Sequence, residues 1–345
     1  MRHSDLLAIP DARRAAIERL GQELRAGRSV ALSTHINSDG DGCGSEVALA
    51  RLLSQLGIEA RIANPTPWPG MFDFLLGSDV RNDSDDAERA IRKSDLIVVL
   101  DISDLRRLGP LGPVVRASQA TKIVIDHHIP SDVAITELAL CDTAACATGE
   151  LIYDLAAVLD LELTAPVAEA LYVALLTDTG GFRFSNTSAR CHAIAGALLA
   201  AGVDPEAMYR RIYASVPIGR LHLLRDALAT LEVDPEYGIA WISVEAGAPE
   251  THGLKSEDLD GIAEHPRSVA GTKLAIFFRD LGHGKVKASF RSAGEVDVNA
   301  FAREFGGGGH AKASGALIAG TLEEVRHDVI AAARVFLEKH GAVAS

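Results

Sequence analysis

Short apolar runs that end in acidic or imidazole side chains are the feature that most constrains the fold of this chain. Segments with helical spacing alternate with these runs, as in a parallel sheet whose strands are joined by crossover helices. Because ligands of such sheets gather at the carboxyl ends of the strands, the pattern predicts an α/β fold with a polar site at one sheet edge. The runs and the residues that follow them are 30–33 before His35, 96–100 before Asp101 and 123–125 before Asp126.

The helix and strand patterns divide the chain into three parts. A helix is predicted over 11–26, and the glycine-rich stretch 40–45 is expected to be a loop, because glycine interrupts regular elements. Further strands are predicted near 59–63, 96–101, 122–126, 272–279 and 285–291. The expected parts are an α/β domain with a mostly parallel sheet over 1–187, a helical connector over 188–232 and a smaller α/β domain over 233–345.

Composition narrows the classes of protein to which the chain can belong. With 345 residues and 48% hydrophobic residues, the chain is long enough for two cores. We expect no membrane span, because no apolar stretch is long and charge-free enough, and the N-terminus lacks the pattern of a secretory signal. The four cysteines form no Cys-x-x-Cys pair, which favours incidental thiols in a reducing compartment. A cytoplasmic protein is therefore expected.

The net charge is distributed unevenly. A formal charge of −13 argues against a protein that coats long nucleic acids, because such binding depends on a basic surface. Between residues 267 and 312, however, basic residues outnumber acidic ones. We therefore expect an anionic substrate to be held locally, by the C-terminal part of the chain.

The polar residues at the expected sheet edge are typical ligands of hard divalent cations. Carboxylate and imidazole donors without thiolate favour Mn²⁺ or Mg²⁺ over structural zinc. Two such ions, about 3.5–4 Å apart, can stabilise both the attacking and the leaving oxygen of a phosphoryl displacement. A single Asp after a strand is more often a turn former or a helix cap. The metal hypothesis therefore depends on the set as a whole: His35, Asp39, Asp41, Asp101, Asp126, His127, His128 and Asp178.

These residues stand in motifs that resemble those of the DHH phosphoesterase superfamily. The resemblance rests on His35-x-x-x-Asp39-x-Asp41-x-x-Gly44-Ser45, Asp101 with Arg107-Leu108-Gly109, Asp126-His127-His128 and Thr177-Asp178-Thr179-Gly180. The C-terminal part resembles the DHHA1 module, through Phe290-Arg291-Ser292, Asp297-Val298-Asn299, residues 305–310 and Ala313-Ser314-Gly315. The order of motifs is similar to that of the branch that combines oligoribonuclease and 3′-phosphoadenosine 5′-phosphate (pAp) phosphatase activities.

The resemblance implies a Rossmann-like DHH domain, a DHHA1 substrate-binding domain and an active-site cleft between them. It also implies a role for each matching residue. One ion would be held by His35, Asp39 and Asp101, and the other by Asp41, Asp101, His127 and Asp178, with a shared activated water as the nucleophile. His128 would bind the phosphate or assist the leaving oxygen, and Asp126 would orient its neighbours. The terminal phosphate would be bound by Arg291, Gly307, Gly308, Gly309, His310 and Ser314.

The resemblance further implies Mn²⁺ as the cofactor, with Mg²⁺ or Co²⁺ as substitutes, and a homodimer. The implied substrates are RNAs of two to five nucleotides and pAp. A linear pApA or cyclic-di-AMP phosphodiesterase is an open alternative, because the core motifs do not separate these dinucleotides. A nucleotide sensor without catalysis is another, and it would bind nucleotide without releasing mononucleotide.

Overall fold

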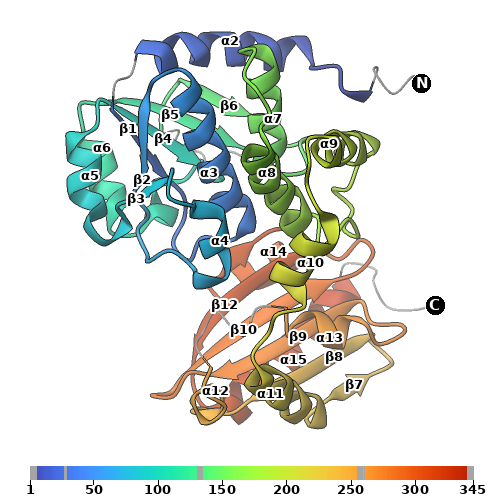
Figure 1. Cartoon of the computed structure of the whole chain (residues 1–345). Coiled ribbons are helices and arrows are strands. Elements are labelled where there is room, and N and C mark those ends of the chain that lie inside the picture. Colours follow the sequence, from blue (N-terminus) through green and yellow to red (C-terminus); the bar gives the residue numbers. More distant parts are fainter. Residues whose placement is uncertain (1–5, 27–28, 130–134, 255–258, 260, 340–345) are drawn as a thin grey trace. The chain divides into compact units, whose positions relative to one another are not determined.

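The computed structural model describes residues 6–26, 29–129, 135–254, 259 and 261–339 (Figure 1). The chain divides into two compact units, Met1–Ala214 and Ser215–Ser345. Within the described residues, none of the helices combines the length and the apolar composition needed to cross a bilayer.

The first unit is built on a six-stranded sheet in which every pairing is parallel, as the α/β pattern predicts. The strand order is β3-β2-β1-β4-β5-β6, so the chain builds outward from β1 on one side and then resumes beside β1 with β4. That reversal between β1 and β4 is where ligands of open α/β sheets bind. The strands are β1 (Ser29–Ser33), β2 (Glu59–Ile62), β3 (Arg81–Asn82), β4 (Leu96–Leu100), β5 (Thr121–Asp126) and β6 (Ala139–Cys141).

Helices cover both faces of this sheet, because alternate residues of the central strands are buried on opposite sides. Val98 packs into the core formed with α2, α3, α7 and α8, whereas its neighbour Val99 packs into the core formed with α5 and α6. Figure 1 shows these two helical layers on either side of the strands. The helices are α2 (Asp11–Ala26), α3 (Gly40–Gln55), α4 (Asp73–Leu76), α5 (Ala87–Lys93), α6 (Leu111–Ala117), α7 (Thr148–Val158) and α8 (Ala165–Asp178), with short 3₁₀ turns η1 (Gly70–Phe72), η2 (Ser84–Asp86) and η3 (Leu105–Leu108).

The glycine-rich stretch 40–45 is the first turn of α3 and not the predicted loop. Asp39 caps the helix, because its side chain accepts hydrogen bonds from the N–H groups of Asp41 and Gly42. The glycines are required by close packing and not by a turn. A Cβ atom on Gly44 would lie 2.4 Å from the carbonyl oxygen of Ala170 in α8. The sequence prediction was wrong because a glycine that lets two helices approach has the same local signature as a loop glycine.

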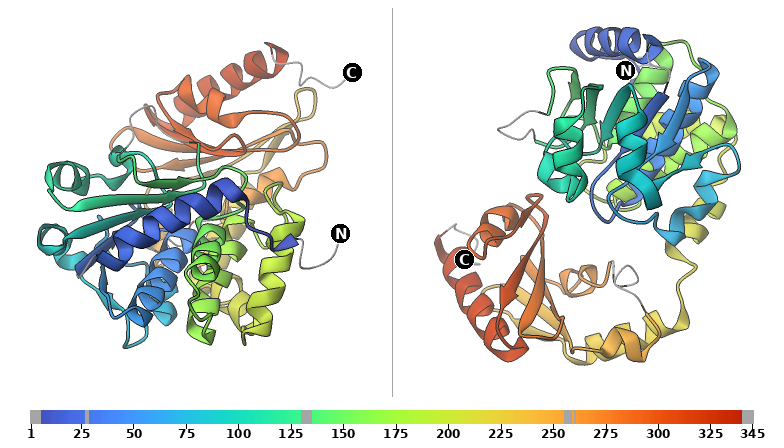
Figure 2. Two further views of the ribbon diagram at one scale, coloured as in Figure 1. Left: turned by 90° about the horizontal axis from the view of Figure 1, so that it is seen from above. Right: turned by 90° about the vertical axis from the view of Figure 1, so that its left-hand side faces the viewer.

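The second unit contains a mixed sheet of order β11-β12-β10-β9-β8-β7, antiparallel except for the β8–β9 pair. Its strands are β7 (Glu232–Asp234), β8 (Ile239–Val244), β9 (Leu274–Asp280), β10 (Lys285–Ser292), β11 (Gly308–Gly309) and β12 (Ala313–Ala319). Helices α14 (Val298–Arg303) and α15 (Leu322–Lys339) bury one face, and Figure 2 shows α15 along it. Part of the other face packs against α11 (Ile218–Ala229) and against the residues that precede α13 (Glu264–Arg267). A short helix, α12 (Ala248–Thr251), lies between β8 and α13 in the sequence.

The stretch expected as a connector is helical. It contains α9 (Ala189–Ala200), α10 (Pro205–Tyr213) and α11. The first two helices belong to the first unit, and α11 belongs to the second.

Candidate metal centre

Five chain segments bring the predicted ligands of the first unit to one place. His35 follows β1, Asp101 follows β4, and His127 follows β5, so these three side chains lie at the carboxyl ends of adjacent strands. Asp39 and Asp41 come from the start of α3, and Asp178 is the last residue of α8. Asp101 adopts a left-handed backbone with φ of 62°, which aspartate tolerates better than most residues and which ends the strand at that point.

One group of donors surrounds the His35 imidazole. Its Nε2 atom lies 3.4 Å from Asp101 Oδ2 and 3.6 Å from Asp39 Oδ2. The donor atoms of these three residues lie within 4.8 Å of one another, as the ligands of a single ion do. The predicted members of the first ion site are therefore together.

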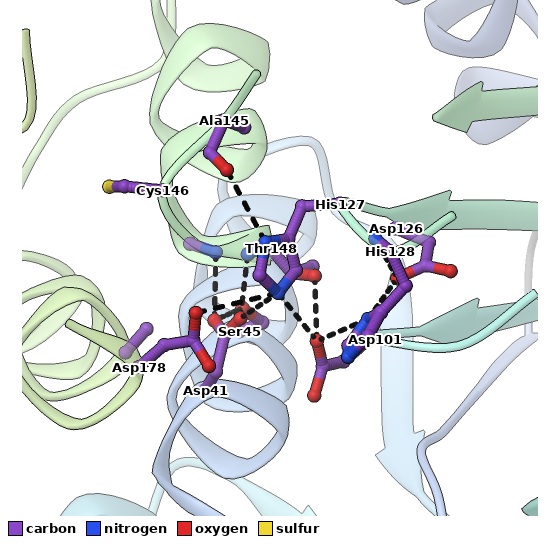
Figure 3. A network of polar contacts seen from close by, with 12 residues as sticks. Asp41, Ser45, Asp101, Asp126, His127, His128, Ala145, Cys146, Thr148 and Asp178 are labelled. Atoms are coloured by element: carbon purple, nitrogen blue, oxygen red, sulfur yellow. Dashed lines mark hydrogen bonds and ion pairs between the residues drawn. The ribbon is translucent and has the colours of Figure 1, made fainter. Parts of the chain in front are cut away.

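A second group surrounds the His127 imidazole (Figure 3). Its Nε2 atom lies 3.6 Å from Asp41 Oδ2, 3.6 Å from Asp101 Oδ1 and 3.6 Å from Asp178 Oδ2. Asp101 thus presents Oδ2 to His35 and Oδ1 to His127. A carboxylate with one oxygen in each group is the arrangement expected of a bridging ligand between two ions.

The hydrogen bonds of the two imidazole rings leave one nitrogen of each ring in position to bind a metal ion. His35 Nδ1 donates to the Ile36 carbonyl oxygen at 2.9 Å, and His127 Nδ1 donates to the Ala145 carbonyl oxygen at 3.3 Å. In the neutral ring, this leaves each Nε2 as a lone-pair donor, oriented as metal-ligating histidines are. Both Nε2 atoms are buried and have no hydrogen-bond partner. Because a buried polar atom is costly to leave unpaired, a cation bound between the carboxylates would satisfy both nitrogens.

The electrostatics of the carboxylates lead to the same conclusion. Burial, followed by the negative charges of Asp101 and neighbouring carboxylates, raises the pKa of Asp41 and the pKa of Asp178 well above the usual value. In the metal-free site, burial would lower the pKa of His35, but the nearby carboxylates of Asp101 and Asp39 outweigh it and raise that pKa to about 10, so a metal ion would compete with a proton for Nε2. The site thus concentrates negative charge, which divalent cations would compensate.

Asp126 and His128 form a separate pair beside the ligands. Asp126 is fully buried, and its Oδ1 atom lies 2.7 Å from His128 Nδ1 and accepts the His128 backbone N–H at 3.0 Å. Burial would lower the pKa of His128, but the hydrogen bond to Asp126 outweighs it and raises that pKa. His128 Nδ1 also lies 3.5 Å from Asp101 Oδ1. Asp126 therefore fixes the orientation of the His128 ring next to the Asp101 carboxylate.

Three further residues that contact the predicted ligands were not predicted. The N-terminus of α7 binds Asp41, because the N–H groups of Thr148 and Gly149 donate to its two oxygens at 2.6 and 2.9 Å. The Thr148 hydroxyl donates to Asp101 Oδ1 at 3.0 Å. Asn186 Nδ2 donates to Asp178 Oδ2 at 3.1 Å and to the Cys146 carbonyl oxygen at 2.9 Å. The only feature of the sequence that could have indicated these contacts is the Thr-Gly pair at the start of a helix, and such a pair is equally typical of an ordinary helix cap.

A buried ionic network supports the same end of α7. Arg13 of α2 contacts Glu150 at 2.9 Å and Asp154 at 2.6 Å, and Arg190 of α9 contacts the same two carboxylates. Glu150 also accepts the N–H of Cys146 at 3.0 Å. The segment that carries the Ala145 carbonyl and the Thr148 donors is thus anchored from two other helices.

The predicted phosphate-binding residues lie in the second unit, on and beside β10, β11 and β12. Arg291 is on β10, and its Nε atom donates to Glu264 Oε1 at 2.7 Å. Gly307 and Gly309 pack tightly, since a Cβ atom would lie 2.1 Å from the Gly315 carbonyl oxygen and 2.6 Å from the Ala313 carbonyl oxygen, respectively.

Several polar groups of this stretch are used within the unit. Gly307 N donates to the Ala302 carbonyl, Gly309 N to Asn299 Oδ1, and His310 N to the Ala313 carbonyl. Ser314 Oγ donates to the His310 carbonyl at 2.7 Å. Gly308, Gly309 and His310 themselves are exposed.

Comparisons with known proteins match both units. The model of the DHH family, N-terminal domain, matches residues 29–175, and that of the DHHA1 domain matches residues 239–339. The bifunctional oligoribonuclease and PAP phosphatase NrnA of Thermus thermophilus is 32% identical to this chain, over 90% of each chain. The Bacillus subtilis protein of the same name is 27% identical, over 84% of this chain and 89% of its own. The crystal structure of an exopolyphosphatase-related protein from Bacteroides fragilis superposes with a TM-score of 0.85 at 28% identity, covering 94% of this chain and 96% of that one.

Proposed function

The chain belongs to the DHH family with a DHHA1 domain, a family of phosphoester hydrolases, and from this premise we propose that it degrades RNAs of two to five nucleotides to mononucleotides and removes the 3′-phosphate of pAp. Relatives named as bifunctional oligoribonuclease and PAP phosphatase support this choice of substrates. The observation that carries the proposal is the pair of buried, unpartnered imidazole nitrogens at the two oxygens of Asp101.

The residues of the first unit would hold two divalent ions. His35, Asp39 and Asp101 would bind one, and Asp41, His127 and Asp178 the other, together with Asp101, whose Oδ1 atom lies 3.6 Å from His127 Nε2. When bound, such ions polarise a phosphoryl oxygen and make a water acidic enough to attack at neutral pH. Oxygen and imidazole donors suit Mn²⁺, with Mg²⁺ and Co²⁺ as substitutes.

His128 would act on the substrate itself. Asp126 holds its ring beside Asp101 through Nδ1, within the group of donors. From there it can bind the phosphate or give a proton to the leaving oxygen. Asp126 would act only through His128, as its orienting partner.

The DHHA1 unit would supply the grip on the terminal phosphate. The guanidinium of Arg291, which contacts Glu264 and the Phe290 carbonyl within the unit, can bind a phosphate oxygen, and the exposed Gly308–His310 stretch lies on the same sheet. A substrate held by its end would present a nearby phosphoester for cleavage. We therefore propose that short oligonucleotides are preferred over long ones.

The test is a time course with Mn²⁺ and end-labelled RNAs of two, five and twenty-five nucleotides, alongside pAp, pApA and cyclic-di-AMP. We expect fast release of mononucleotide from the short RNAs and from pAp, with loss of both activities in Asp126→Ala and His127→Ala. Equal turnover of the twenty-five-mer would contradict the length preference. Turnover of cyclic-di-AMP or pApA alone would make the protein a signalling phosphodiesterase, and nucleotide binding without turnover would make it a sensor.

A further inference from the structure

The arginine expected to bind phosphate already holds an anion of its own chain. Glu264 Oε1 lies 2.7 Å from Arg291 Nε, and Glu264 Oε2 lies 2.6 Å from Arg267 Nη2. Each carboxylate oxygen therefore contacts a different guanidinium. A phosphate that bridges two arginines makes the same pattern of charge-assisted contacts.

The backbone that carries Glu264 is anchored, whereas its carboxylate is accessible. Its N–H donates to the Gly261 carbonyl at 3.0 Å, and Ile262, Ala263 and Pro266 beside it are buried. The side chains of Glu264, Arg267 and Arg291 are 29%, 29% and 25% exposed, respectively. A ligand can therefore reach the carboxylate, and the carboxylate can swing away by side-chain rotation without unfolding the segment.

The charges favour an exchange with a more highly charged anion. The carboxylate carries one negative charge, whereas a terminal phosphate monoester carries roughly 1.5 to 2 near neutral pH and offers three acceptor oxygens. Between two guanidiniums, the phosphate therefore gains more than the carboxylate it replaces.

We propose that Glu264 is a built-in competitor for the substrate's terminal phosphate, occupying Arg291 and Arg267 until a phosphate monoester displaces it. This inference rests on the proposed function of Arg291 and assigns to Glu264 a part in substrate selection. The carboxylate must be displaced by any anion that binds the two arginines, so weakly charged anions are excluded, and removal of its charge should strengthen most the binding of a ligand that carries a terminal monoester.

The experiment measures the dissociation constants of pApA and ApA by equilibrium titration of the full chain with EDTA present, so that no hydrolysis occurs. Glu264→Gln removes the competing charge and keeps the shape of the side chain. We expect about tenfold tighter binding of pApA, and a smaller gain for ApA, which lacks the terminal monoester. Glu264→Asp, which keeps a carboxylate, should stay near the wild type and shows whether the segment tolerates substitution.

A charge-matched control separates this effect from a general change in net charge. Glu323→Gln removes one exposed carboxylate from α15, a helix that packs on the opposite face of the sheet, and should leave both constants unchanged. Unchanged or weaker binding of pApA by Glu264→Gln would overturn the inference, because the carboxylate would then support Arg291. If the wild type binds pApA and only the gain is missing, the inference fails and the proposed function stands; if no protein binds pApA, the inference fails, and the Mn²⁺ time course decides the proposed function separately.

Discussion

The charged side chains of the two candidate sites are arranged in opposite ways in the two units. In the first unit, buried carboxylates face one another and two buried imidazole nitrogens that have no hydrogen-bond partner. In the second, two partly exposed arginines share the single carboxylate of Glu264. The first arrangement leaves buried polar atoms that an external ion would satisfy, whereas the second already pairs its charged groups within the unit. Changes in the first unit should therefore have large effects on function or stability, and changes in the second should shift affinity gradually.

The largest effect is expected at the residue shared by both donor groups. Asp101→Asn replaces a carboxylate oxygen that faces His35 or His127 by an amide nitrogen, which is no ligand. Because loss of outer partners alone costs metal sites roughly 10–100-fold, we expect activity to fall by more than about 100-fold. Mn²⁺ stoichiometry by calorimetry should fall below two per chain. Full activity in the variant would contradict the role of Asp101 as the residue shared by both donor groups.

A substitution of Glu46, which is not one of the predicted metal ligands, would measure how much a buried carboxyl group costs the stability of the first unit. Its side chain is fully buried, Oε1 has no partner, and Oε2 accepts from Asn64 Nδ2 at 2.9 Å. Burial raises the pKa of Glu46 to about 8. Because the folded state keeps a proton that the unfolded state has lost, this group lowers the free energy of unfolding as pH rises from about 5 to 8, by at most about 5 kcal/mol.

Glu46→Gln should remove this pH dependence. In denaturant unfolding of the metal-free protein, the variant should match the wild type near pH 5 and exceed it by several kcal/mol near pH 8.5. Glu18→Gln, on the exposed side of α2, serves as the control and should give a difference that does not change with pH. A constant difference for Glu46→Gln would show that its carboxylate is not held neutral in the fold.

Substitution of the residues that hydrogen-bond to the predicted metal ligands should have intermediate effects. Asn186→Ala removes the bonds to Asp178 Oδ2 and to the Cys146 carbonyl, and we expect Mn²⁺ affinity to fall by roughly 10–100-fold. Ser45→Ala is the matched control. It removes only a 3.2 Å bond to Asp41, whose oxygens keep two backbone donors from α7, so the loss should be smaller. Equal losses would mean that these hydrogen bonds do not position the ligands.

The smallest effects are expected in the second unit. Arg291→Lys keeps the charge and loses the planar fork that binds phosphate oxygens, so KM for a dinucleotide should rise by about tenfold. Lys287→Gln removes an exposed charge from the same strand and should change KM less. A larger loss in Lys287→Gln would assign the binding to general positive charge and not to the arginine.

The sequence predicted the residues that strand ends bring together, and missed those that depend on the approach of distant elements. His35, Asp101 and His127 were predictable because they follow apolar runs, and parallel strands align their carboxyl ends. Thr148 and Asn186 were not, because their contacts with Asp101 and Asp178 arise from the packing of α7 and α8 against the sheet.

The other differences have the same physical origin. The stretch 40–45 carries glycine for close packing against α8, which local sequence cannot distinguish from a loop. Likewise, nothing in the sequence near Arg291 indicates that a glutamate 27 residues earlier neutralises it. Short-range patterns report element type and strand ends, whereas charge pairing between separate elements is set by tertiary structure.

The most direct test of the account is a titration of the metal-free protein with Mn²⁺ in which bound ions and hydrolysis of a dinucleotide are measured in the same samples. The account predicts two bound ions per chain at saturation, no hydrolysis without metal, and full activity only as the second equivalent binds. Full activity at one ion per chain, or hydrolysis in the absence of metal, would contradict the assignment of two donor groups joined by Asp101.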